Sequence, residues 1–97
     1  MPPLNTTYKA IPFECLDPFI LYDILALREK VFTLEQRCTV PDLDNLDKQA
    51  IHIIGQCNGC LCATARILPP NVYKPNVSSF GRFLVKKNFE TWESLLN

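Results

Sequence analysis

The sequence predicts a single small domain of the α+β class. Residues 18–34 carry the apolar period of an amphipathic helix, residues 50–68 have the pattern of a β-hairpin, and residues 80–85 form one more apolar strand. The chain has 97 residues, of which 47% are hydrophobic and 21% charged, and this is the composition of a folded domain. Such a length allows one domain and excludes a multidomain enzyme.

The first part of the chain is expected to form a strand and then the main helix. Residues 8–13 alternate loosely, and Pro12, which has no N–H for a sheet ladder, suits an edge strand or a strand end. Asp17 and Pro18 are an N-cap and a first-turn proline, the pair expected at a helix start. The apolar residues at helical spacing are Ile20, Ile24, Leu27 and Val31.

Residues 35–49 are expected to form an exposed connection. The segment loses its apolar period and contains Pro41 and three aspartates, Asp42, Asp44 and Asp47. A calcium loop would need a bidentate glutamate and a turn glycine at fixed offsets, and the segment has neither. The three carboxylates are therefore interpreted as a solvated loop.

The hairpin prediction depends on its turn. Asn58-Gly59 supplies the two residues with positive φ that a type I′ turn requires, between two β-prone runs. With a tight turn and a regular ladder, Cys57 faces Cys60 and His52 faces Ala65.

The last part of the chain is expected to contain a strand and a short helix. Pro69-Pro70 ends the hairpin, and a loop rich in proline, asparagine and serine leads to the strand at residues 80–85. Residues 89–96 are predicted to be helical from the spacing of four apolar side chains, Phe89, Trp92, Leu95 and Leu96.

Charge and cysteine content narrow the functional classes. Ten basic residues balance ten acidic ones, so no cationic field favours nucleic acid or an anionic membrane surface. The longest apolar run is far shorter than a membrane-spanning helix requires. Five cysteines are an odd number, and the first residues lack the pattern of a signal peptide, so we expect a reduced, cytoplasmic protein.

The cysteine spacing also leaves a zinc-binding adaptor open as a minor alternative. Cys57 and Cys60 have the two-residue spacing of a zinc knuckle. Tetrahedral zinc needs four ligands, and the sequence offers no second pair of this kind, so we predict no metal site. Small buried cysteines in a strand are the simpler interpretation.

Several motifs, taken in order along the chain, resemble one enzyme family. They are Leu27-Arg28-x-x-Val31-Phe32-x-x-Glu35-Gln36, the aspartates that follow, His52, Ala65-Arg66-Ile67-Leu68-Pro69 and Gly81-Arg82-Phe83-Leu84-Val85. Their order and spacing, from about Leu21 to Val85, resemble the ElaA-like branch of the GNAT N-acetyltransferase superfamily. The resemblance implies the amino-terminal half of a GNAT-like fold, with a mixed or antiparallel sheet and one main amphipathic helix.

The resemblance also implies acetyl transfer from acetyl-CoA to a small-molecule or peptide amine. In such folds the strand that matches residues 80–85 offers main-chain groups to the pantetheine arm, which lies along it like an added strand. The residues expected to bind acetyl-CoA in this way are Phe83, Leu84 and Val85.

Three side chains are candidates for the chemistry. The attacking amine must be neutral, and Glu35 and His52 are available by type as the base that deprotonates it. Arg28 could bind an acidic group of the substrate or a CoA phosphate. Structural roles stay open for all three: a local pair for Glu35, a structural histidine on a strand, and a packed aliphatic stem for Arg28.

The chain departs from the family pattern after residue 85. Family members carry a glycine-rich loop there, whose N–H groups and following helix bind the CoA pyrophosphate. Residues 88–97 contain no glycine, and Glu90 and Glu93 bring negative charge to this region. We therefore expect acetyl transfer to be inactive or incomplete in this chain. The alternative is a non-catalytic interaction module that pairs, with itself or a partner, through an unfinished sheet edge.

Overall fold

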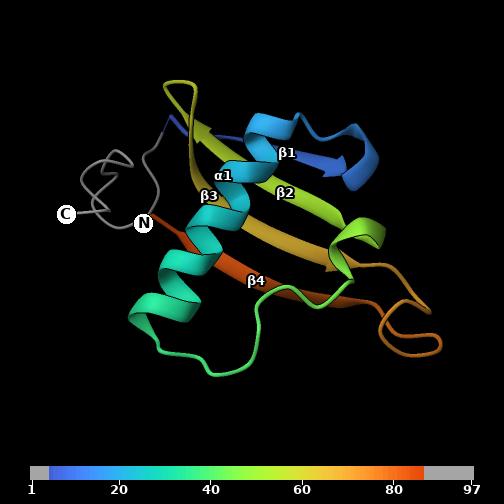
Figure 1. Ribbon diagram of the computed structural model, residues 1–97. Coiled ribbons are helices and arrows are strands. Elements are labelled where there is room, and N and C mark those ends of the chain that lie inside the picture. The colour runs from blue at the N-terminus through green and yellow to red at the C-terminus, as the bar shows by residue number, and fades with distance from the viewer. Residues whose placement is uncertain (1–4, 87–97) are drawn as a thin grey trace.

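The computed structural model describes residues 5–86 of the chain, so the helix predicted at residues 89–96 lies outside the described residues. Four strands form one antiparallel sheet in the order β1-β2-β3-β4 (Figure 1). The strands are β1 (Thr7–Pro12), β2 (Ile51–Cys57), β3 (Cys60–Leu68) and β4 (Ser79–Val85). The helical segments are η1 (Phe13–Cys15), α1 (Pro18–Arg28), η2 (Glu29–Glu35) and η3 (Asp47–Gln49). The α+β class is confirmed, and the sheet is wholly antiparallel.

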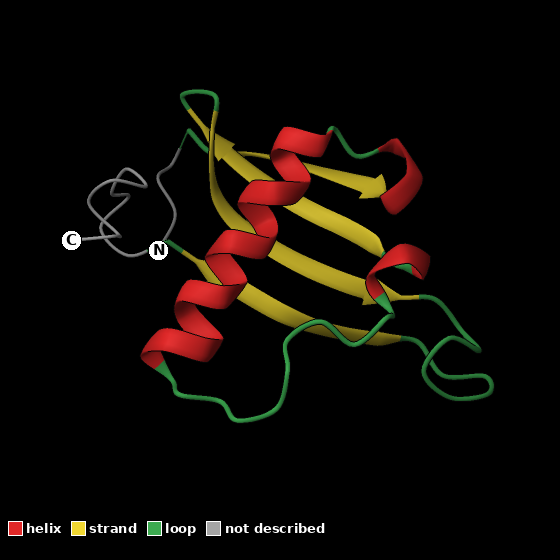
Figure 2. Cartoon of the chain, in the orientation of Figure 1, coloured by secondary structure: helices red, strands yellow, loops and turns green. Residues whose placement is uncertain are grey.

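Helix α1 begins at the position that its N-cap predicts, and after Arg28 it continues as a π-helix. The Asp17 carboxylate accepts a hydrogen bond from the Phe19 N–H at 2.7 Å, and Pro18 occupies the first turn. After Arg28 the chain continues as the π-helical segment η2, whose last turn is closed by the Gln36 N–H donating to the Val31 carbonyl at 2.9 Å. Figure 2 shows α1 and η2 as one continuous helical body lying across the sheet.

The β2–β3 turn has the conformation that its sequence predicts. Asn58 and Gly59 both have positive φ, at 55° and 78°, and Cys57 pairs with Cys60 across the turn.

The predicted pairing of His52 with Ala65 is wrong. The register shifts between Gly55 and Gln56, and His52 pairs with Arg66. A bulge adds one residue to β3, and every pairing beyond it moves by one position. Since directly opposite residues share a face of the sheet, the bulge brings the imidazole and the guanidinium to the same face.

The hydrophobic core lies between α1 and one face of the sheet. Its fully buried members are Ile24, Leu27, Ile54, Leu61 and Leu84. By strand alternation the opposite face carries Tyr8, Phe80 and Phe83, which keep 56%, 59% and 60% of their surface exposed. Within residues 5–86, no helix is both long and apolar enough to span a membrane.

Candidate functional site

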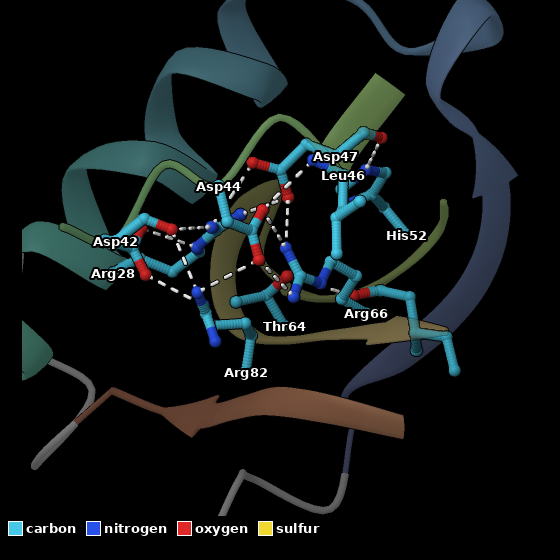
Figure 3. Close-up of polar contacts among 10 residues, drawn as sticks. Arg28, Asp42, Asp44, Leu46, Asp47, His52, Thr64, Arg66 and Arg82 are labelled. Atoms are coloured by element: carbon cyan, nitrogen blue, oxygen red, sulfur yellow. Dashed lines mark hydrogen bonds and ion pairs between the residues drawn. The ribbon is translucent and has the colours of Figure 1, made fainter. Parts of the chain in front are cut away.

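Three arginines and three aspartates form a closed ring of ion pairs on the face of the sheet that α1 covers (Figure 3). The arginines come from α1, β3 and β4, and the aspartates come from the connection before β2. Followed pair by pair, the ring is Arg28, Asp42, Arg82, Asp44, Arg66, Asp47 and Arg28 again. Each charge therefore lies between two opposite charges, and the ring is neutral.

Arg28 is the most buried member, with 1% of its surface exposed. Two of its nitrogens donate to the two carboxylate oxygens of Asp47, at 2.8 and 3.3 Å. Its Nε lies 2.8 Å from Oδ2 of Asp42. A buried guanidinium needs opposite charge close by, and these two carboxylates supply it, although the buried Nε makes an ion pair without a hydrogen bond.

The other two arginines connect the ring to the sheet. Arg66 donates to both carboxylate oxygens of Asp44 at 2.9 Å and to Asp47 at 3.1 Å. The Nε of Arg82 lies 2.9 Å from Oδ1 of Asp42, and its Nη2 donates to the Asp42 carbonyl at 2.9 Å. Helix α1, β3 and β4 are thereby joined through one loop.

The ring shifts the ionisation of its members. Burial alone would raise the pKa of Asp44, but hydrogen bonds from Arg66 and the Leu46 N–H, with the charges of Arg66 and Arg82, lower it to about 2. Burial likewise opposes the charge of Asp47, and Arg28 and Arg66 outweigh it, so the pKa of Asp47 is lowered. The same carboxylates overcome burial at Arg66 and raise its pKa.

His52 lies next to Asp47 of the ring (Figure 3) and is also fully buried, at 1% exposure. Its Nε2 is 3.0 Å from the Asp47 carbonyl oxygen, and its ring lies 6.0 Å from the Phe13 ring, centroid to centroid. Of the two predicted base candidates, Glu35 is the exposed one and ends η2. Figure 1 shows the end of η2 and the start of β2 well apart, so the structure does not bring Glu35 and His52 together.

Strand β4 is an edge of the sheet, since β3 is its only neighbour among the described strands. The Lys86 N–H donates to the Cys62 carbonyl at 2.8 Å, and Leu84 pairs with Thr64. Because main-chain groups alternate in direction along a strand, the carbonyl of Phe83 and both the N–H and the carbonyl of Val85 point away from β3. Leu84 itself is buried in the core.

A pocket of about 230 Å³ lies between the end of η2, the following loop and β4. It is lined by Phe32, Cys38, Val40, Pro41, Asp42 and Arg82. In this pocket the apolar side chains lie next to the carboxylate of Asp42, close to the edge strand β4.

The hairpin cysteines do not form a metal centre within the described part of the chain. Residues 5–86 contain no group of three or more histidine, cysteine or acidic side chains arranged to hold a metal ion. Cys57 instead donates from its thiol to the Asn5 side-chain oxygen at 3.3 Å.

Sequence reasoning identified Arg28 and His52 as special but missed the groups that bind them. The interpretation of the aspartates as a solvated loop is wrong, because each of them is ion-paired and Asp47 is buried. A signal was available: Arg66 and Arg82 interrupt apolar strands, and with Arg28 they match the three aspartates in number.

The antiparallel four-stranded sheet crossed by one main helix matches a GNAT-like acyl-CoA N-acyltransferase fold, over somewhat less than two thirds of the length of two solved structures. An acyl-CoA N-acyltransferase from Pseudomonas aeruginosa superposes with a TM-score of 0.79 at 26% identity, over 95% of this chain and 64% of that one. Escherichia coli ElaA superposes with a TM-score of 0.78 at 29% identity, over 94% of this chain and 62% of that one.

Sequence comparison finds two relatives that are described as UPF0039 proteins. One from Synechocystis sp. is 46% identical over 68 residues, and one from Schizosaccharomyces pombe is 42% identical over 67 residues. These matches cover 69% and 68% of this chain but span only 44% and 43% of the relatives' length. No family model matches the chain.

Proposed function

We propose that this chain is the amino-terminal half of an ElaA-like N-acetyltransferase, which transfers an acetyl group from acetyl-CoA to a small-molecule or peptide amine. The shared fold with ElaA and the Pseudomonas acyltransferase supports this class of reaction. The observation that carries the proposal is the open edge of β4, where the main-chain groups of Phe83 and Val85 point outward. On its own the chain is catalytically incomplete, and its location is the cytoplasm.

The edge of β4 suits a pantetheine arm, whose amides alternate donors and acceptors as a peptide does. An extended ligand that pairs with a sheet edge gains main-chain hydrogen bonds without rearranging the sheet. Val85 supplies one donor and one acceptor, and Phe83 supplies a further acceptor. The Leu84 side chain is buried in the core and so holds β4 against α1 and the rest of the sheet.

In the transfer step the amine nitrogen forms a bond to the acetyl carbon, the carbon–sulfur bond breaks, and the CoA sulfur leaves with the electron pair. The proton of the amine passes to a base. We propose Glu35 for this role ahead of His52, because Glu35 is exposed whereas the imidazole is enclosed and its Nε2 is in contact with a carbonyl. Arg28 stays a predicted substrate-binding residue. In the structure it is paired with two carboxylates of the ring, Asp42 and Asp47.

Calorimetric titration with acetyl-CoA tests the proposal on three proteins. The wild type is expected to give saturable heat. Val85→Pro removes an N–H that the β3 ladder does not use, so the sheet should persist while affinity falls by about tenfold, the equivalent of one hydrogen bond. Val85→Ala keeps the N–H and should bind like the wild type. Absence of heat from the wild type at millimolar acetyl-CoA would remove the proposal.

A second function, an interaction module that forms homo-oligomers through the β4 edge, is favoured by one observation. The only charged residue of β4 is Arg82, and its side chain turns toward Asp42, so within this strand no charged side chain opposes pairing with another strand. Sedimentation velocity at rising concentration measures this. A dimer that Val85→Pro abolishes, in a protein that does not bind acetyl-CoA, would establish the module and not the enzyme.

A further inference from the structure

Arg82 has a backbone conformation that its residue type disfavours. Its φ is 51°, in the left-handed region, although it lies in the middle of β4. Gly81 next to it would adopt that conformation freely, yet the positive φ falls on the arginine. A conformation of this kind persists where surrounding contacts hold it, and such positions concentrate at functional sites.

The contacts that hold Arg82 are those of the ion-pair ring. Asp42 receives the guanidinium through both its side chain and its carbonyl, each at 2.9 Å, and Asp44 lies 3.4 Å from Nη2 (Figure 3). Asp42 is in turn bound to Arg28 on α1, and Asp44 to Arg66 on β3. The side chain of Arg82 is thus anchored, through Asp42 and Asp44, to two other elements.

The strained residue coincides with a shift of register. Arg66 pairs with Gly81, but Thr64 pairs with Leu84, so β4 contains one residue more than β3 between these pairs. Without this bulge the ladder would continue with Thr64 opposite Phe83. A slip of one residue moves each side chain of β4 to the other face of the sheet. It also exchanges the main-chain groups that face β3 with those that face the open edge. Leu84 would then leave the core, and its N–H would replace that of Val85 at the open edge.

We infer that Arg82 is a positioning residue that selects the register of β4. Through Asp42 and Asp44 it holds the bulge, and the bulge determines that Val85, not Leu84, presents its N–H and carbonyl at the acyl-CoA edge. The inference rests on the proposed function for the identity of the ligand. The choice of register itself is independent of any ligand.

Amide hydrogen exchange measured by NMR tests the register directly. In the wild type the amides of Leu84 and Lys86 should be protected and that of Val85 should exchange fast. Arg82→Gln removes the charge that holds residue 82 at a positive φ, which glutamine disfavours as much as arginine, so the bulge should be lost and protection should pass to Phe83 and Val85. Arg82→Gly accepts the positive φ, so it should fold with both registers populated and exchange at least about tenfold faster at Leu84 and Lys86. Arg66→Lys is the control, since it disturbs the ring but leaves Arg82 on Asp42.

Acetyl-CoA titration of the same proteins separates this inference from the proposed function. Arg82→Gln and Arg82→Gly should weaken acetyl-CoA binding by about tenfold or more, because the edge groups are displaced, whereas Arg66→Lys should not. Unchanged protection at Leu84 and Lys86 in both Arg82 variants would overturn the inference. A wild type that fails to bind, with protection still lost in the variants, would overturn the proposed function and keep the register assignment.

Discussion

The two faces of the sheet differ in how far their side chains are buried and paired within the protein. On the face covered by α1, even a guanidinium with 1% exposure has two carboxylate neighbours. On the opposite face, Tyr8, Phe80 and Phe83 each leave more than half of their surface in solvent. On the covered face the charged side chains pair with one another, whereas on the opposite face aromatic rings are exposed to solvent.

This difference separates the source of stability from the place of interaction. Changes on the covered face remove partners from buried charges, so they should be measured as loss of folding free energy. Changes to the exposed rings remove little buried surface, so they should alter contacts with other molecules instead. Substitutions of the buried charges and of the exposed rings therefore have different expected results.

The largest effect is expected from Arg28→Ala, which leaves Asp42 and Asp47 without one of their cationic neighbours. Removing one member of a buried pair costs about 3–5 kcal/mol of unfolding free energy. Urea unfolding followed by circular dichroism measures the loss. Lys9→Ala, at an exposed position, is the control. A loss below about 1 kcal/mol would mean that the ring is a surface feature in solution.

Gly55→Val should have the next largest effect. A Cβ at Gly55 would lie 2.9 Å from Tyr8 Cε1 and 3.1 Å from the Ala63 Cβ, so the larger residue overpacks the uncovered face. The expected cost is about 1–3 kcal/mol, measured as a lower urea midpoint. Gly81→Val is the matched control, because no atom outside its chain neighbours lies within 4 Å of an added Cβ at Gly81. Equal losses in both variants would show that backbone entropy, not crowding, sets the result.

Acidification should weaken the covered face to a smaller extent, because Asp44 retains 28% side-chain exposure. Its pKa is lowered to about 2 in the folded chain from 3.8, so its contribution is complete above pH 3.8 and is lost as the pH falls toward 2. The lowered pKa of Asp47 acts in the same direction. Thermal unfolding between pH 2 and 6 should show this slope, and Asp44→Asn should reduce it. A melting temperature that rises on acidification would contradict the assignment.

The smallest change in stability is expected from Phe83→Lys. The ring is 60% exposed and contacts Phe80 at a centroid distance of 6.3 Å, so the unfolding free energy should change by no more than about 0.5 kcal/mol. Self-association measured by sedimentation should fall, because the added charge guards the edge. A stability loss comparable to that of Arg28→Ala would show that the uncovered face supports the fold.

Local signals predicted the elements well, whereas the ring needed information that local signals lack. Asp17 and Pro18 mark the helix start, and Asn58-Gly59 fixes the hairpin, since each acts within a few residues. The ring joins residues 14 to 40 positions apart, and no periodicity predicts such pairs. The His52 pairing was wrong for a related reason: a bulge in β3 shifts the ladder and leaves no composition signal.

The ring also has a consequence for the rates of folding and unfolding. Its pairs close only after α1, the loop, β3 and β4 have all docked, so they are expected to form after the transition state. Interactions of that kind leave the folding rate nearly unchanged and slow the escape from the native state. The ring should therefore act chiefly by slowing unfolding, which lengthens the lifetime of the folded chain.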